Sequence, residues 1–303
     1  MKTAIITGAS SGIGLALTRH LLTLKSPRWR VIMAARHPPH EALDIDPVRT
    51  LFVPTDVSSW TDMTALFETA WAWTEIATDS ATESNRIDFI AANAGTDDKE
   101  SIYAPMNLDV GPEKPDLTCV EVNFLSVFYA LKLFVYYARK TRASMIDASD
   151  FNPKMVITGS CVGQYPFVVA PQYCAAKHGV VGLTRSVGRK LLDDDNVAVN
   201  CVMPGFVPTG LASPELLAAW PREHQTSMDA VIRAFMELID DKGLVKQDGL
   251  SNGTSGVIKT AHTVEVVGHD LFYRTEVESA NESMAFLRAQ AEPGGLWQSM
   301  YRE

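Results

Sequence analysis

The sequence predicts an α/β protein with a doubly wound parallel sheet, in which helices cover both faces and make three layers. Short β-branched runs alternate with longer helical patterns along nearly all of the 303 residues, as in a parallel sheet with right-handed crossovers. Most of the strand-like runs are continuously apolar, which suits strands covered on both faces. A glycine-rich turn over residues 8–14 joins the first strand-like run to the first helical one.

Strands and helices are expected in regular alternation. The strand-like runs are Ala4–Thr7, Arg30–Ala35, Leu51–Val53, Ile87–Ala92, Met155–Thr158, Val197–Val202 and Thr263–Val267. Apolar residues at helical spacing lie between them near 13–24, 60–75, 118–140, 173–192 and 213–240. Prolines and a glycine mark 96–117 as a loop, and 141–153 is interpreted as a surface insertion. The stretch 243–260 is rich in Gly, Ser, Asn and Thr and is interpreted as a connection.

Composition and charge limit the classes of protein. With 46% hydrophobic and 21% charged residues, the chain can bury a full core in one large domain or two ordinary ones. Because no repeat or linker divides it, we expect a single domain over residues 1–303. The net charge of −9 argues against nucleic acid as a partner, since such a field repels phosphate backbones.

Cysteine usage and hydropathy indicate the compartment. The chain has four cysteines, Cys119, Cys161, Cys174 and Cys201. They lack the pairing of metal sites, so we expect reduced thiols and no metal. No signal peptide fits, because the first strand and its loop occupy 3–14. The most apolar long run, Phe124–Ala138, contains Ser126 and Lys132 and is too short to span a bilayer. We therefore expect a soluble cytoplasmic protein without membrane contact.

The first glycine cluster indicates a phosphate site. Its pattern is Gly8-x3-Gly12-x-Gly14, which differs from the GxGxxG spacing of the common dinucleotide fingerprint. By itself the cluster is compatible with an ordinary turn. A strand before it and a helix after it favour a cradle, because backbone then approaches a ligand closely at a helix N-terminus.

The end of the second strand bears on the choice of dinucleotide. Folds that prefer NAD usually carry a carboxylate there, bonded to the ribose hydroxyls. Here the position is Ala35, and Arg36 follows. A missing negative charge beside a guanidinium suits the 2′-phosphate of NADP(H), although Arg36 at the end of a solvent-facing loop is the alternative. We expect NADP(H), with NAD(H) as the second candidate.

Tyr173 and Lys177 form the strongest local signal for chemistry. They stand at i and i+4 of a helical pattern and so share one face. A free phenol has a pKa of about 10 and is a poor base. A nearby ammonium and an oxidised nicotinamide favour the phenolate and lower that pKa. An ordinary pair on one helix face is the competing interpretation, since the spacing arises easily by chance.

Two polar residues extend this pair. Ser160 ends a buried strand thirteen positions before Tyr173, and its hydroxyl could bond the oxygen that Tyr173 protonates or deprotonates. Asn123 lies inside an otherwise apolar helix. A buried amide needs partners, and a water held toward Lys177 would satisfy it and complete a proton relay. Alternatively, Asn123 kinks or caps the helix.

These motifs together resemble the classical short-chain dehydrogenases/reductases, whose fold is Rossmann-type. TGASSGIG resembles the family's cofactor loop, and Asp56-Val57, Asn93-Ala94-Gly95 and Pro204-Gly205 follow at family-like intervals. The resemblance covers roughly residues 2–210. It implies catalysis by Asn123, Ser160, Tyr173 and Lys177. It also implies cofactor contacts from Gly8, Ser10, Ser11, Gly12, Ile13, Gly14, Arg36, Asp56, Val57, Asn93, Ala94, Gly95, Tyr173, Lys177, Pro204, Gly205, Val207 and Thr209.

Three departures from the family pattern are visible. Only one asparagine precedes Ala94-Gly95, Ala176 replaces a serine of YxASK, and the Asn123-to-Ser160 interval is long. Within the family, residues 173–186 and 204–209 resemble the 15-hydroxyprostaglandin-dehydrogenase-like branch. That branch normally oxidises secondary alcohols with NAD, in conflict with Arg36, and we place the local charge argument first.

We expect hydride transfer between nicotinamide and a ketone or secondary alcohol, with Tyr173 as general acid/base. A helical substrate lid is predicted over about 206–242, before a variable C-terminal region over about 243–303. Its larger apolar residues are Phe206, Leu211, Leu216, Leu217, Trp220, Met228, Phe235 and Met236. They suit an apolar, moderately bulky small molecule, unless they only pack the lid on the core.

Two other uses of the fold remain open, an isomerase or cyclase and a non-catalytic nucleotide-binding regulator. Surplus apolar residues on the patterns at 118–140 and 173–192 indicate an interface, and the family resemblance implies a homodimer or homotetramer through them. Burial of these residues within the monomer is the competing account.

Overall fold

The chain is described by a computed structural model that covers residues 1–39, 48–76, 85–105, 107–240, 258–292 and 294–297. Two compact units, Met1–Tyr273 and Arg274–Glu303, make up the chain. The first unit contains the sheet and every sequence-predicted site residue. Among the described residues of the second unit lies the helix α8 (Glu282–Ala291), which begins where the Asn281 side chain accepts a hydrogen bond from the Met284 amide.

The first unit is built on an eight-stranded sheet in the order β3-β2-β1-β4-β5-β6-β7-β8. The strands are β1 (Lys2–Thr7), β2 (Trp29–Ala35), β3 (Thr50–Pro54), β4 (Phe89–Ala92), β5 (Lys154–Thr158), β6 (Ala198–Pro204), β7 (Thr263–Val267) and β8 (Asp270–Arg274). Every pairing from β3 through β7 is parallel. The order reverses between β1 and β4, which creates the crevice where doubly wound folds bind ligands.

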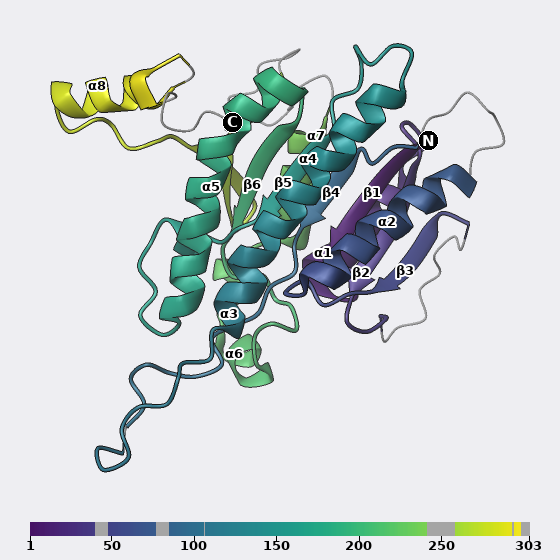
Figure 1. The fold of residues 1–303 in the computed structure, drawn as a ribbon. Coiled ribbons are helices and arrows are strands. Elements are labelled where there is room, and N and C mark those ends of the chain that lie inside the picture. The colour runs from purple at the N-terminus through teal and green to yellow at the C-terminus, as the bar shows by residue number, and fades with distance from the viewer. Residues whose placement is uncertain (40–47, 77–84, 106, 241–257, 293, 298–303) are drawn as a thin grey trace. The chain divides into compact units, whose positions relative to one another are not determined.

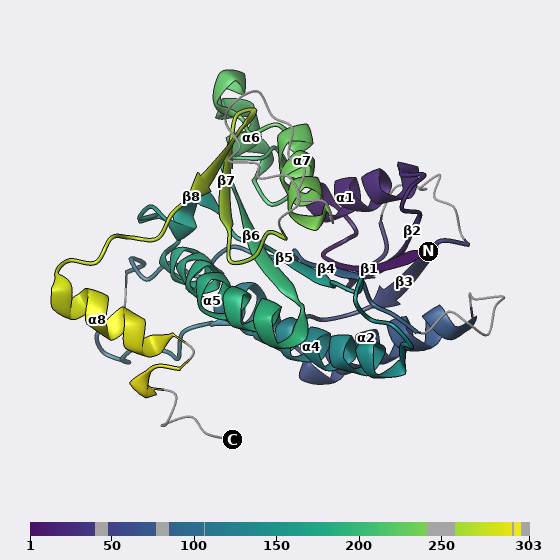
Figure 2. The ribbon, with the colours of Figure 1, turned by 90° about the horizontal axis from the view of Figure 1, so that it is seen from above.

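Helices cover the two faces of this sheet, which confirms the predicted fold class (Figures 1 and 2). The helices of the first unit are α1 (Gly12–Thr23), α2 (Trp60–Ile76), α3 (Thr118–Val120), α4 (Ser126–Ser144), α5 (Pro171–Asp195), α6 (Pro214–Ala219) and α7 (Met228–Ile239). Figure 2 places α2, α4 and α5 on one face and α1 and α7 on the other. Each face has its own hydrophobic cluster.

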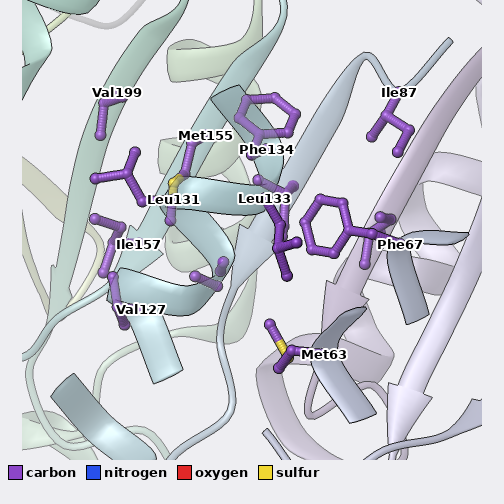
Figure 3. Packing of buried hydrophobic residues seen from close by; sticks show 14 of the residues in the cluster. Met63, Phe67, Ile87, Val127, Leu131, Leu133, Phe134, Met155, Ile157 and Val199 are labelled. Carbon is purple, nitrogen blue, oxygen red and sulfur yellow. The ribbon is translucent and has the colours of Figure 1, made fainter. Parts of the chain in front are cut away.

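Continuous apolar strands explain the two-sided core. All seven residues of β2 and of β6 are buried, so alternate side chains feed opposite clusters. Figure 3 shows the cluster beneath α2 and α4, where Phe67 and Phe134 pack with Met155 and Ile157 of β5. This packing holds the carboxyl ends of the strands in fixed relative positions.

The region predicted as one helix near 213–240 is divided. α6 ends before Trp220, a short 3-10 turn spans Arg222–His224, and α7 begins at Met228. Pro221 explains the break, because proline lacks an amide donor and disfavours helical conformation in the residue before it. β8 was not predicted, and most of 243–260 and the end of the lid lie outside the described residues.

The apolar run around Phe124–Ala138 lies in a longer helical segment than predicted. Helical structure continues over Thr118–Ser144, and by length and composition alone this segment meets the requirements for crossing a membrane. Its buried side chains, among them Val127, Leu131 and Phe134, belong to the cluster that packs on the sheet.

Candidate active site

The glycine cluster forms a tight cradle between β1 and α1. Gly8 and Gly12 have positive φ values of 67° and 51°, a conformation that favours glycine. A Cβ on Gly14 would stand 2.4 Å from the Gly8 carbonyl oxygen and 2.7 Å from Asn93 Nδ2. α1 then starts after Ser11, whose side chain makes no capping hydrogen bond. The cradle therefore presents a helix N-terminus without a side-chain cap, as a bound phosphate requires.

Asn93 connects the cradle to the neighbouring strands. Its amide nitrogen Nδ2 donates to the Thr7 carbonyl oxygen at 3.0 Å, and Thr158 Oγ1 donates to its Oδ1 at 3.0 Å. The backbone amides of Asn93 and Ala94 donate to Thr7 Oγ1 at 2.9 and 3.1 Å. These bonds join the ends of β1, β4 and β5 beside the cradle. Thr7 and Thr158 were not among the predicted site residues.

The segment after β6 lies over the cradle. A Cβ on Gly12 would be 3.3 Å from Thr209 Cβ and Cγ2, so Thr209 closes over the glycine turn. Val207 is buried in the cluster beneath α1 and α7. The Thr226 amide donates to the Phe206 carbonyl oxygen at 2.7 Å, which joins the two ends of the segment between them.

The predicted lid residues differ in burial. Phe235 is fully buried, and Met228 and Met236 pack against the same cluster, so these three stabilise the core. Leu211 and Leu216 are exposed. Phe206 and Trp220 stack with ring centroids 4.1 Å apart, which attaches the end of α6 to the strand end.

The ends of β2 and β3 carry the predicted charges. Ala35 is buried at the end of β2, and Arg36 is exposed. Asp56 accepts hydrogen bonds from the Ser58 amide and hydroxyl at 2.9 and 2.7 Å. These bonds, with a smaller contribution from Arg36, lower the pKa of Asp56. Val57 next to it is buried in the core.

Tyr173 and Lys177 share the first turns of α5, as predicted. Lys177 Nζ lies 5.3 Å from the centroid of the Tyr173 ring and donates to the Thr158 carbonyl oxygen at 2.8 Å. Burial lowers the pKa of Lys177 to about 8. Burial also raises the pKa of Tyr173 above its usual value, against a smaller opposite effect of the hydrogen bond with Ser160.

The raised phenol pKa refines the sequence expectation. That expectation combined the Lys177 ammonium with the positive charge of an oxidised nicotinamide. The chain's own residues leave the neutral phenol favoured, because desolvation outweighs the bond from Ser160. In the protein alone, the Tyr173 phenol therefore keeps its proton at neutral pH.

Ser160 stands at the carboxyl end of β5 and is nearly buried. Its hydroxyl accepts from the Val162 amide at 3.3 Å and lies 3.4 Å from the Pro204 carbonyl oxygen, to which it donates. The hydroxyl thus lies between the Pro204-Gly205 turn and the Tyr173 phenol. This position suits the orientation of a substrate oxygen.

Asn123 lies in a π-helical turn, Glu121–Leu125, between α3 and α4. Its Nδ2 donates to the carbonyl oxygens of Thr96 at 2.7 Å and Cys119 at 2.8 Å. Its Oδ1 and Lys177 Nζ lie 2.9 and 3.9 Å from the place where a Cβ of Gly95 would stand. Gly95 therefore leaves room between the two polar atoms, as the predicted relay requires.

A glycine cradle at the switch point, next to a buried Tyr–Lys pair at the ends of adjacent strands, defines a dinucleotide-binding protein of the oxidoreductase class. A family model described as short chain dehydrogenase matches residues 2–218. The chain belongs to the short-chain dehydrogenase/reductase family, and it is an oxidoreductase enzyme.

Three similar proteins illustrate this relationship. "Short-chain dehydrogenase/reductase prx6" of Penicillium rubens is 30% identical over 79% of this chain and 79% of its own. "NADP-dependent dehydrogenase clz5" of Cochliobolus lunatus is 28% identical over 68% of this chain and 71% of its own. A solved structure, "ElxO with NADP Bound", has a TM-score of 0.64 at 18% identity, covering 88% of this chain and 96% of that one.

Proposed function

We propose that the enzyme transfers hydride between NADP(H) and a ketone or secondary alcohol of an apolar, moderately bulky small molecule, with Tyr173 as general acid/base. The observation that carries the proposal is the position of the Tyr173 phenol. Ser160 acts on this phenol and lowers its pKa, Lys177 Nζ lies beside the ring, and both stand at the carboxyl edge of the sheet that also holds the glycine cradle.

The residues around the crevice fit a dinucleotide. A Cβ would fill the cradle at Gly14, and two of its glycines have positive φ, so backbone amides are free to approach a pyrophosphate. Asn93-Ala94-Gly95 would contact the adenosine side, and Pro204-Gly205 with Val207 and Thr209 would reach the nicotinamide amide. When bound, the dinucleotide supplies the hydride donor or acceptor.

The chain's own residues supply proton transfer and orientation. The Ser160 hydroxyl donates a hydrogen bond to the substrate oxygen, and the neutral Tyr173 phenol gives its proton to that oxygen during reduction. Lys177 holds the ribose hydroxyls, and Asn123 holds the water that returns a proton through Lys177. Acid–base catalysis of this kind contributes about 10²–10⁴-fold to the rate.

NADP(H) is favoured by the end of β2. Ala35 offers no carboxylate that would repel a 2′-phosphate, and the exposed guanidinium of Arg36 can bind one through paired hydrogen bonds. The printed name of the clz5 relative, an NADP-dependent dehydrogenase, supports the same choice.

The cofactor preference is tested by the double variant Ala35→Asp/Arg36→Ala. Fluorescence titration is expected to give at least about tenfold tighter binding of NADPH than of NADH to the wild type, the strength of a charge-assisted contact. The double variant is expected to reverse that ratio. Arg28→Ala, just before the opposite end of β2 and also exposed, removes the same charge and should leave this ratio unchanged. If the ratio of NADPH to NADH affinity were the same in the double variant as in the wild type, the assignment of Arg36 to the 2′-phosphate would be wrong.

The reaction itself is tested with purified protein, NADPH and a panel of ketones that differ in size and polarity. Loss of nicotinamide absorbance with a bulky apolar ketone, faster than with small polar ones, is the expected result. If every ketone were turned over only at the background rate, and a compound were converted without net oxidation or reduction, an isomerase or cyclase would instead be favoured.

The 15-hydroxyprostaglandin-dehydrogenase-like motifs at 173–186 and 204–209 favour a different use of the site. A member of that branch would oxidise secondary alcohols with NAD. Faster oxidation of alcohols with NAD than with NADP, in the same panel, would make that branch the better description.

We also propose a homodimer or homotetramer formed through α4 and α5. Leu131, Phe134 and Tyr137 are buried within the monomer, whereas Phe128 and Tyr136 are exposed on α4. Light scattering is expected to give two or four times the 33.2 kDa of one chain. Tyr136→Asp should lower that mass toward one chain, because the interface would then bury a carboxylate. A wild-type mass of one chain would contradict the proposal.

A further inference from the structure

The helix that carries Tyr173 begins without a cap of its own. α5 starts at Pro171, which has no amide hydrogen, and the residue before it is Ala170, whose side chain accepts no hydrogen bond. The next two amides, of Gln172 and Tyr173, therefore need acceptors from elsewhere. One of them is the backbone amide of the proposed acid/base residue itself.

Asp98 supplies both acceptors from a distant part of the chain. Its Oδ2 accepts from the Gln172 amide at 3.0 Å, and its Oδ1 accepts from the Tyr173 amide at 2.7 Å. Asp98 lies three residues after Gly95, in the loop that follows β4. A carboxylate at this place is also favoured by the partial positive charge of the helix N-terminus.

The same carboxylate reaches the turn that holds Asn123. Burial is the main cause that raises the pKa of the Cys119 thiol to about 12, and the nearby Asp98 carboxylate raises it further. The thiol therefore keeps its proton. Asn123 Nδ2 in turn donates to Cys119 Sγ at 3.2 Å. Cys119 therefore lies between Asp98, which acts on its pKa, and Asn123, which donates to its sulfur.

The backbone of the same loop adds a second connection. Thr96, two residues before Asp98, exchanges bonds with Asn123, whose Nδ2 donates to the Thr96 carbonyl oxygen at 2.7 Å. The Gln172 side chain donates to the Asp116 carbonyl oxygen at 2.9 Å, at the far end of the loop. The loop between residues 95 and 117 is therefore attached at both ends to the helices that carry the site.

We infer that Asp98 is a positioning residue of this active site, which sets the place of the Tyr173 phenol relative to Ser160 and Lys177 by holding the first turn of α5. The inference rests on the proposed function for its kinetic consequence. Asp98 does not touch the glycine cradle, so its effect should fall on turnover and spare dinucleotide binding.

The test compares Asp98→Ala and Asp98→Asn with Glu100→Gln in the full chain. The asparagine variant keeps one acceptor oxygen of two, and the alanine variant keeps none. Glu100 is the matched control, because it lies in the same loop and its carboxylate accepts from the Asp116 amide at 2.9 Å. Its substitution removes the same charge without touching α5.

The first readout needs no substrate. Tyrosinate absorbance is titrated for each variant and for the same variant carrying Tyr173→Phe, and the difference isolates Tyr173. Groups that act on this phenol are Ser160, Asp97, Cys161 and Cys119, with Lys177 beside the ring. Loosening the helix start admits water to the phenol, so its raised pKa should fall by about one unit in Asp98→Ala. Glu100→Gln should leave it unchanged.

The second readout is kinetic, with NADPH and the most active ketone of the panel. We expect kcat to fall about 10²-fold in Asp98→Ala, as for a small displacement of a reacting group, and less in Asp98→Asn. The dissociation constant and stoichiometry of NADPH should stay within twofold. If the amount of NADPH bound per chain fell by the same factor as kcat, the variant would simply contain less folded protein, and the inference would be overturned.

The two readouts separate this inference from the proposed function. If the wild type reduced none of the ketones but the Tyr173 pKa still fell in Asp98→Ala, the proposed reaction would be contradicted and the positioning role retained. An unshifted titration with unchanged kcat in Asp98→Ala would overturn the positioning role and leave the proposed reaction intact.

Discussion

Replacement of Tyr173 by phenylalanine is expected to lower kcat by about 10³-fold, within the range of general acid–base catalysis, while NADPH still binds. The substitution removes only the phenolic oxygen. The ring stays beside Lys177, whose Nζ remains held by the Thr158 carbonyl oxygen at 2.8 Å, and the glycine cradle is untouched. Steady-state turnover of a ketone and fluorescence titration with NADPH measure the two quantities on the same preparation.

Tyr165→Phe is the matched control for this result. Tyr165 stands between Ser160 and Tyr173 in the sequence, and its hydroxyl donates to Glu265 Oε2 at 3.3 Å. Its loss removes the same atom from the same region without removing the proposed proton donor. We expect less than about a threefold change in kcat, as for a hydroxyl outside the chemistry. Tyr173→Phe with more than a tenth of wild-type turnover would defeat the assignment.

The second large effect is expected at Gly14. In Gly14→Ala the new methyl group would stand 2.4 Å from the Gly8 carbonyl oxygen and 2.7 Å from Asn93 Nδ2. Neither neighbour moves cheaply, because Asn93 is bonded to Thr7 and Thr158. We expect at least about tenfold weaker NADPH binding and a destabilisation of about 1–3 kcal/mol, typical of overpacking. Thermal unfolding and fluorescence titration measure the two effects.

Gly182→Ala shows what a methyl group does where there is room. Nothing lies within 4 Å of a Cβ at Gly182 in α5, and alanine is the better helix former by about 1 kcal/mol. We therefore expect an unchanged or slightly higher unfolding temperature and unchanged NADPH binding. If Gly14→Ala bound NADPH as tightly as Gly182→Ala does, the cradle would not be the pyrophosphate site.

Local patterns in the sequence predict most of this fold. Continuous apolar runs such as Val31–Ala34 are buried on both faces, and this property is visible in the sequence itself. The boundaries that failed depend on single residues. Pro221 divides the predicted lid helix, and a two-residue turn at Gly268–His269 adds β8 to the edge of the sheet. Such features involve only a few residues, so the hydrophobic periodicity of the longer flanking segments does not reveal them.

Parts of the candidate site could be predicted where the spacing of the residues has a chemical reason. Tyr173, Lys177 and the glycines could be recognised because their spacing has a chemical reason. Asp98 could not, because its partner Tyr173 is 75 positions away and an aspartate in a loop has no distinguishing pattern. One signal was present in the sequence, since a helix beginning Ala170-Pro171 offers no capping side chain and requires an acceptor from elsewhere.

The bond between the Phe206 carbonyl oxygen and the Thr226 amide has a consequence for how this enzyme could diversify. This bond brings the two ends of the stretch between Phe206 and Thr226 together, so the stretch leaves and rejoins the rest of the fold at one place. The helix α6 within it has no buried residue. Loops of this kind tolerate change because few core contacts depend on them. Under the proposed function, we expect that the part of this stretch around α6 can be exchanged to change the substrate range, while Val207, Thr209 and the proposed proton-transfer residues stay unchanged.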